Sequence, residues 1–123
     1  MLDHVSIQVD DIAVASAFYD AVFEPLGYRR VMDFGDTIGY GDVFPAFWIG
    51  VRTDPIPNRQ SHLAFQAPSR AAVDAFLATA VAAGAEVLHE PRVWPEYHPG
   101  YYGAFVRDPD GNNIEAVHHT FDS

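Results

Sequence analysis

The chain contains no cysteine and no lysine, and its seven basic residues are all arginines. These absences exclude thiolate nucleophiles, disulfides, thiolate metal sites, Schiff-base lysines and the lysine of a phosphate-binding loop. No run of apolar residues reaches the roughly 18 that a membrane-spanning helix needs. No basic, apolar leader precedes the first strand-like segment. We therefore expect a cytoplasmic protein without a membrane partner.

Charge and apolar content limit the partners further. The 123 residues carry a formal net charge of -10, whereas binding to nucleic acid or to an anionic membrane surface needs clustered basic residues. Hydrophobic residues make up 49% of the chain and include nine Phe, six Tyr and two Trp. This is enough for one packed domain with aromatic side chains left over to line a pocket. The composition favours a small-molecule ligand, cationic or metal-bound, and argues against nucleic acid.

The first half of the chain has the pattern of a strand, a helix and three more strands. Residues 3–9 alternate between apolar and polar side chains, as in a half-buried strand. Asp10 and Asp11 provide an N-cap for a helix over residues 12–23, which Pro25 and Gly27 terminate. Three further strands are predicted at residues 28–34, 37–40 and 46–52.

The pattern then starts again after a segment without periodicity. Residues 54–60 are predicted to be a linker between a first module at about 1–53 and a second at about 61–123. An offset of 62 − 4 = 58 aligns residues 3–9 with residues 61–67 and superimposes His4 on His62. Apolar residues of the two helices also align, and so, after a slip of one residue, do the glycines that follow them. Agreement over a whole strand-helix unit indicates an internal duplication.

The second module repeats the βαβββ order. Ser69 is the predicted N-cap of a helix that ends at about Ala83, and strands are predicted at residues 86–90, 101–107 and 114–117. Residues 91–100, rich in Pro, aromatic and His residues, are predicted to form a loop that could line a pocket. The sequence Asp108-Pro-Asp-Gly-Asn is dense in turn-forming residues and is expected to reverse the chain before the last strand.

Glu115 lies on this last strand, where a carboxylate is costly to bury without a charged partner, hydrogen bonds or a metal. The duplication puts His4 and His62 at equivalent points of equivalent strands, on the face opposite the apolar residues. A single histidine on a strand is more often structural than a ligand, but two related by a repeat can converge if the modules pack about a pseudo-two-fold axis. His4, His62 and Glu115 are therefore the candidate metal ligands, with coordination positions left open.

These features together resemble the vicinal oxygen chelate superfamily. The resemblance rests on His4 in Asp-His-Val-Ser-Ile, His62 in Ser-His-Leu-Ala-Phe and Glu115 in Asp-Pro-Asp-Gly-Asn-Asn-Ile-Glu, and it covers nearly the whole chain. The superfamily includes glyoxalase I, extradiol dioxygenases, fosfomycin-resistance proteins, methylmalonyl-CoA epimerase and the metal-free bleomycin-resistance proteins. The motifs identify a fold better than a reaction.

The resemblance implies an α+β fold in which two tandem βαβββ modules form a cupped mixed sheet with the helices on the outside. It implies a divalent metal ion at the three candidate ligands, and these ligand types suit Mn, Fe, Ni, Co or Zn. Glyoxalase I has a further carboxylate on the fourth strand of the first module, where this chain reads Phe47-Trp-Ile-Gly. Glyoxalase I activity is therefore less expected than dioxygenase or fosfomycin-resistance chemistry. Members of the family often dimerise, and we expect a homodimer.

Aromatic, His and Arg residues are candidates for the wall of a substrate site. Tyr and His could act as acid or base, and Arg could hold an anionic group, although any single aromatic residue could equally belong to the core. His89, His118 and His119 are expected at the surface. The candidate substrate-binding residues are Trp48, Tyr97, His98, Tyr101, Tyr102 and Arg107.

Three functions remain open from the sequence. The leading hypothesis is a divalent-metal-dependent enzyme that acts on a small oxygen-rich molecule by isomerase, lyase, transferase or dioxygenase chemistry. The alternative is a binding protein of the bleomycin-resistance type, which sequesters a small cationic ligand without catalysis. The third is a scaffold in which His4, His62 and Glu115 form a structural hydrogen-bonded cluster. Retention of all three residues favours the enzyme.

Overall fold

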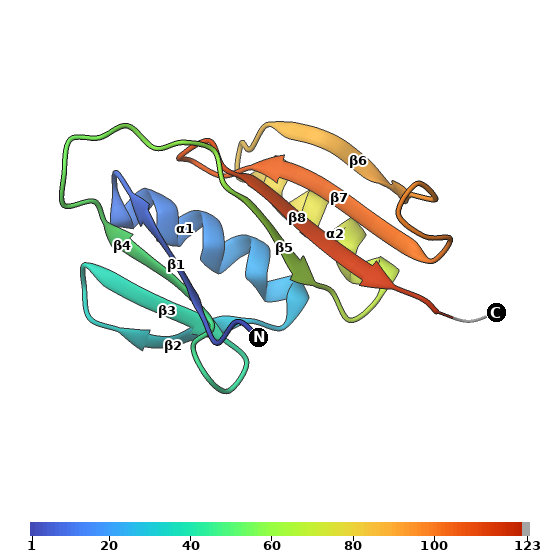
Figure 1. The fold of residues 1–123 in the computed structure, drawn as a ribbon, viewed down its shortest axis with the longest axis horizontal. Helices are drawn as coiled ribbons and strands as arrows, with labels where there is room; N and C mark the ends of the chain where they lie inside the picture. Colours follow the sequence, from blue (N-terminus) through green and yellow to red (C-terminus); the bar gives the residue numbers. More distant parts are fainter. Residues whose placement is uncertain (122–123) are drawn as a thin grey trace.

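The computed structural model describes residues 1–121 and contains two βαβββ modules in tandem, as predicted (Figure 1). The first consists of β1 (Val5–Val9), α1 (Ile12–Phe23), the short 3-10 helix η1 (Glu24–Leu26), β2 (Arg29–Asp33), β3 (Thr37–Gly41) and β4 (Phe47–Val51). The second consists of β5 (His62–Gln66), α2 (Arg70–Ala82), β6 (Val87–Val93), β7 (Tyr101–Arg107) and β8 (Asn113–His119). Residues 122–123, the end of the predicted second module, lie outside the described part of the chain.

Each module forms its own four-stranded mixed sheet. The strand orders are β1-β4-β3-β2 and β5-β8-β7-β6, with the first two strands of each order parallel and the others antiparallel. One helix packs on one face of each sheet, α1 on the first and α2 on the second (Figure 1). Within residues 1–121 the other face of each sheet has no helix over it. We call these the open faces of the first and second sheets.

The helices begin and end where the sequence predicts. The Asp11 carboxylate caps α1 and the Ser69 hydroxyl caps α2 by accepting backbone N–H hydrogen bonds. Gly27 and Gly84, the pair matched by the repeat, each adopt a φ of 86°, a left-handed conformation that strains residues with a Cβ atom. In the described residues, neither helix has the length and apolar character needed to cross a membrane.

One hydrophobic core joins the modules. The inner side chains of both sheets and the buried sides of both helices form a single cluster. Within it, Phe65 of β5 packs edge to face against Phe23 and Phe47 of the first module, with ring centroids 4.8 and 5.1 Å apart. Aromatic side chains bury more apolar surface than other residues and therefore contribute strongly to the stability of a core. The two modules are therefore packed together by their helix-covered sides.

The turn before β8 also links the modules. Asp108 is buried, and its carboxylate accepts hydrogen bonds from the backbone N–H of Asn112 at 2.8 Å and from the Tyr19 hydroxyl of α1 at 2.5 Å. Burial and the neighbouring Asp108 raise the pKa of Tyr19 well above its usual value, so the phenol stays a donor. The side-chain oxygen of Asn112 accepts from Asn58 and from the backbone N–H of Ser61. The turn is thus hydrogen-bonded both to the first module and to the linker.

The largest difference between a predicted boundary and the structure is at the end of β6. The loop predicted over residues 91–100 begins only at Trp94, because β6 continues to Val93. Pro91 lacks a backbone N–H and would interrupt a central strand, but β6 is an edge strand and its pairing with β7 shifts register around this residue. The edge position tolerates the missing donor, so the strand runs through the proline.

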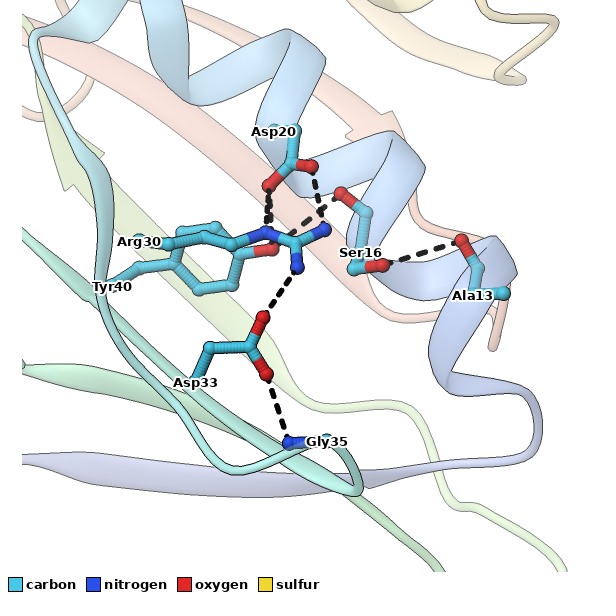
Figure 2. A network of polar contacts seen from close by, with 7 residues as sticks. All are labelled: Ala13, Ser16, Asp20, Arg30, Asp33, Gly35 and Tyr40. Atoms are coloured by element: carbon cyan, nitrogen blue, oxygen red, sulfur yellow. Dashed lines mark hydrogen bonds and ion pairs between the residues drawn. The ribbon is translucent and has the colours of Figure 1, made fainter.

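A polar network ties α1 to β2 and β3 (Figure 2). Arg30 donates to the two oxygens of Asp20 at 2.9 and 2.7 Å and to Asp33 at 2.9 Å, while the Tyr40 hydroxyl donates to Asp20 at 2.9 Å. Burial opposes ionisation of Asp20, but the hydrogen bonds from Arg30 and Tyr40 outweigh it and lower the pKa of this carboxyl. The folded chain therefore favours the ionised form of Asp20.

Replacing Asp20 by Asn removes the charge and keeps an acceptor for Tyr40. The folded pKa of Asp20 lies below its unfolded value of about 3.9, so its contribution is complete above that pH and is lost as the pH falls through the folded pKa. At pH 7 we expect Asp20→Asn to lower the free energy of unfolding by about 0.5–1 kcal/mol, a small value because solvent screens the partly exposed pair. Urea denaturation at a series of pH values measures it. Equal stability of the two proteins at pH 7 would contradict the prediction.

Candidate functional site

Glu115 occupies the middle of the second sheet. Strand β8 lies between β5 and β7, and Glu115 is paired with Ala64 on one side and Phe105 on the other. Its side chain is directed to the open face, since its neighbours Ile114 and Ala116 belong to the core on the helix side. The residue is nevertheless only 1% exposed. A carboxylate buried in this way requires polar partners.

Two side chains supply those partners. His62 Nε2 donates to Oε1 of Glu115 at 3.0 Å, and the Tyr101 hydroxyl donates to Oε2. Burial raises the pKa of Glu115, while the hydrogen bonds from Tyr101 and His62 act against that rise. Burial and the Glu115 carboxylate raise the pKa of Tyr101, so the phenol remains a donor. Each oxygen of the carboxylate is thus held by a different residue.

The separation of His62 and Glu115 is an ordinary hydrogen-bond distance and is also compatible with two ligands of one divalent metal ion. Two ligand atoms at right angles, each about 2.1 Å from one ion, are about 3.0 Å apart, and the Nε2 to Oε1 distance is 3.0 Å. Half of the His62 side chain is exposed, so an ion can reach it from solvent. An imidazole with a carboxylate suits Mn, Fe, Ni, Co and Zn. The metal would take the place of the proton that the two groups share.

His4 lies in the other module. It precedes β1, its side chain is more than half exposed, and its Nδ1 donates to Asp3 at 2.7 Å. It lines a hollow of about 500 Å³ on the open face of the first sheet together with Ser6 and Trp48. Within residues 1–121 no three His, Asp or Glu side chains gather closely enough to hold an ion. One chain brings together two of the three predicted ligands, and the three-ligand centre stays a prediction.

The strand registers identify what the first module has in place of Glu115. Ala64 pairs with Glu115 in the second sheet, and Ser6, which the offset of 58 relates to Ala64, pairs with Trp48 in the first. The fourth strand of each module therefore presents one side chain at the same point, a carboxylate in the second and an indole in the first. Trp48 stacks on Phe34 with ring centroids 6.3 Å apart. The first open face thus combines a histidine with an aromatic wall.

Three of the predicted substrate residues lie around the second open face. The Tyr101 ring covers Glu115 through the hydrogen bond already described. Tyr97 is exposed beside it, with ring centroids 4.8 Å apart. His98 is bonded to His119, Nε2 to Nδ1, at 2.9 Å, and both imidazoles pack against the Tyr101 ring. Their role toward a substrate stays a prediction.

Tyr102 and Arg107 have partners elsewhere. The Tyr102 hydroxyl donates to Asp74 of α2 at 2.7 Å, which puts this side chain on the helix-covered side of β7. Arg107, at the end of β7, donates to the Gln60 side chain at 2.6 Å and to the backbone carbonyl of Gly111 at 2.9 Å. The Tyr102 side chain is therefore bonded on the side of the sheet away from Glu115, and the Arg107 side chain is bonded to the linker and to the turn before β8.

Aromatic residues beside His62 were not among the predicted site residues. Phe105 lies 5.9 Å from the His62 ring, and Trp94 and His89 pack edge to face against Phe105 at 5.1 and 5.3 Å. The alternation of residues 101–107 puts Phe105 in phase with Tyr101 and could have revealed it. No pattern in the sequence predicts that Trp94 packs beside Phe105. His89 is exposed, as expected, and its ring contacts Phe105 on the open face of the second sheet.

An apolar cavity of about 450 Å³ reaches His62 from between the modules. Its walls come from the first module and from the whole of β5, so it crosses the boundary between them. The volume is in the range of small-molecule sites. Apart from the residues of β5, its lining consists of Leu2, Val5, Phe23, Tyr28, Tyr40, Gly41, Ala46 and Phe47.

Replacing Glu115 by Gln keeps the shape of the side chain and one acceptor oxygen, for His62, while the amide NH2 would donate to the Tyr101 hydroxyl. The substitution removes a charge that burial disfavours. Because the folded pKa of Glu115 is raised, its contribution to stability is complete below the unfolded pKa of about 4.3 and is lost as the pH rises through the folded pKa. In EDTA at pH 7 we expect Glu115→Gln to leave the free energy of unfolding unchanged or raise it by about 1 kcal/mol. Urea denaturation measures this, and a loss above about 2 kcal/mol would refute it.

Known proteins share both the sequence pattern and the fold. The family model described as Glyoxalase/Bleomycin resistance protein/Dioxygenase superfamily matches residues 1–116. A glyoxalase/bleomycin resistance protein from Albidiferax ferrireducens T118 has a similar crystal structure, with a TM-score of 0.80 and 34% identity over 97% of this chain and 98% of that one. For lactoylglutathione lyase from Agrobacterium tumefaciens the values are 0.69 and 28% over 96% and 92%.

A similar relative without a stated activity is the YqjT protein of Bacillus subtilis (strain 168), which is 27% identical over 94% of this chain and 97% of its own length. The family match covers both modules and includes His4, His62 and Glu115. The chain belongs to the glyoxalase/bleomycin resistance protein/dioxygenase superfamily.

Proposed function

We propose that this protein is a divalent-metal-dependent enzyme of the vicinal oxygen chelate type. The observation that carries the proposal is the pairing of His62 and Glu115, a half-exposed imidazole and a buried carboxylate at the separation of two ligands of one ion. A carboxylate whose pKa is raised by burial is typical of a functional site. His4, its repeat-related imidazole, is the proposed third ligand.

We further propose that two copies of the chain complete the site. His4 belongs to the open face of the first sheet and the pair belongs to that of the second, and neither face has a helix over it in the described residues. In a symmetric dimer each first module can face the second module of the other copy, which forms two equal sites. Exposed apolar side chains beside His4, at Met32, Phe34 and Phe44, favour a buried interface there.

The proposed substrate is a small molecule with oxygen atoms that can chelate the ion. A bound divalent ion with open positions supplies Lewis acidity toward such oxygens. The chain itself contributes aromatic walls at Trp48, Trp94 and Tyr97, and an apolar cavity beside His62 that can hold a carbon skeleton. Isomerase, lyase, transferase and dioxygenase reactions all begin from such a complex. Any of the five metals named above suits the ligand set.

Lactoylglutathione lyase chemistry, the activity named for the Agrobacterium tumefaciens relative, is not the proposed reaction. A fourth ligand, a second carboxylate, would occupy the first-module strand that carries Trp48. The register pairs Trp48 with Ser6 as it pairs Glu115 with Ala64. An indole cannot ligate a metal in place of a carboxylate. The proposed site therefore has three protein ligands.

The alternative function is binding without catalysis. The net charge of -10 and the aromatic side chains on both open faces suit a cationic aromatic ligand, which would stack on the rings and be attracted by the surrounding carboxylates. Such a protein needs no metal. Metal binding by the protein therefore separates the two functions.

The metal site is tested with protein purified without a His tag and supplied with Mn2+, Co2+, Ni2+, Zn2+ or anaerobic Fe2+. We expect one ion per chain in the wild type and loss of at least about tenfold in affinity on replacing His4, His62 or Glu115 by Ala, because each removes a ligand. His118→Ala is the matched control, since His118 bonds the backbone of Ala67 and is no proposed ligand. Calorimetry and elemental analysis measure binding. Wild type that binds none of these ions would refute the enzyme proposal.

A shared site makes a second prediction. His4→Ala and Glu115→Ala chains each lack a complete site, but a dimer of one with the other keeps one complete site out of two. After unfolding and refolding together in equal amounts, about a quarter of the wild-type metal capacity should return, as expected for random pairing in a symmetric dimer. Each variant refolded alone is the control. No recovery in mixed dimers would indicate a site within one chain.

A further inference from the structure

We propose that Tyr101 is a positioning residue that restricts Glu115 to binding a metal through Oε1 alone. The proposal rests on the proposed function, because it concerns the same carboxylate. Its basis is the division of the Glu115 oxygens between two partners: Oε1 faces His62 Nε2, and Oε2 accepts the Tyr101 hydroxyl. An oxygen that accepts a phenol proton is a poor second ligand for a cation.

The Tyr101 side chain crosses over Gly103 of β7, which has no side chain, to reach Glu115. The register pairs Tyr101 with His119 and Glu115 with Phe105, so the two side chains are not directly opposite. Gly103, midway between Tyr101 and Phe105 on the same face, has no side chain in the way. A Cβ atom on Gly103 would lie 3.1 Å from Oε2 of Glu115 and 3.3 Å from the Tyr101 ring. The glycine thus makes room for both groups and for their hydrogen bond.

The Tyr101 ring is itself held on two sides. Tyr97 packs against it with ring centroids 4.8 Å apart, and His119 packs edge to face at 5.1 Å. His119 is fixed in turn by the hydrogen bond with His98. The phenol has little freedom to rotate away, so the Oε2 position is restrained before any ion arrives. Second partners of this kind orient metal ligands and tune their affinity.

Restriction to one oxygen changes what the site can do. A carboxylate that binds through both oxygens occupies two coordination positions, whereas one that binds through Oε1 occupies one. With two imidazoles and one carboxylate oxygen, three positions of a six-coordinate ion stay free. A substrate that chelates through two oxygens needs two of them. Tyr101 therefore keeps one position free beyond the two that a chelating substrate takes, and a water molecule or a second reactant can bind there.

The neighbouring residue on β7 provides a matched control. Tyr102 is also a tyrosine whose hydroxyl donates to a carboxylate, that of Asp74, but it does so on the helix-covered side, away from Glu115. Tyr101→Phe and Tyr102→Phe make the same chemical change one position apart. An effect through the stability of β7 would appear in both variants, while an effect through Glu115 would appear only in the first.

The test uses Co2+ added to the metal-free protein, with calorimetry for affinity and visible absorption for coordination. We expect Tyr101→Phe to lower the absorption per bound ion, since a carboxylate free to bind through both oxygens raises the coordination number of Co2+. Gly103→Ala, whose Cβ would lie 3.1 Å from Oε2 of Glu115 and 3.3 Å from the Tyr101 ring, should disturb their hydrogen bond by a different route and lower the absorption as well. Tyr102→Phe should leave affinity and spectrum as in the wild type.

The outcomes distinguish this proposal from the proposed function. If the wild type binds Co2+ and Tyr101→Phe retains the wild-type spectrum, the positioning role is refuted and the metal site stands. If Tyr102→Phe shows the same changes as Tyr101→Phe, the effect is structural and the role is also refuted. If the wild type binds no Co2+, the proposed function fails and this proposal fails with it. Circular dichroism of each variant establishes that it is folded.

Discussion

In residues 1–121 each module has a single α-helix for a four-stranded sheet, and a helix can cover only one face of a sheet. The covered faces meet in one shared core, and the open faces are left to find other partners. On the second sheet this constraint explains the surroundings of Glu115, whose carboxylate is buried by Tyr101 and by the strands around it rather than by a helix. Glu115 and its partners therefore lie on the open face of the second sheet, outside the shared core.

The duplication has produced two unequal halves. Backbone features have been kept in both modules, including the strand order and the left-handed glycine after each helix. The open faces have diverged, because Trp48 stands at the point of the first sheet where Glu115 stands in the second. The first open face combines a histidine with aromatic side chains, whereas the second combines a histidine with a carboxylate. If the two faces meet in a dimer, as proposed, they would form one asymmetric site from unlike halves.

Periodicity and turn-forming residues were sufficient to predict the βαβββ order, both helix caps and the turn before β8, because these depend on neighbouring residues. The end of β6 was missed, since the tolerance of Pro91 depends on its place at a sheet edge. His62 and Glu115 lie within hydrogen-bond distance of each other, and their role as metal ligands stays a prediction. The separation of His4 could not be foreseen, because a repeat relates positions within modules and not the modules to one another. The bond of Tyr101 to Glu115 depends on a gap at Gly103 that no local pattern reveals.

The turn at residues 108–112 does more than reverse the chain. It is the origin of β8, which carries Glu115, and it is bonded to Tyr19 in the first module and to Asn58 in the linker. A shift of this turn would therefore move the carboxylate and the opposite module as one body. If the proposed dimer forms, this turn would link the two proposed metal sites through each subunit, so that occupation of one site would alter the affinity of the other without any contact between the substrates.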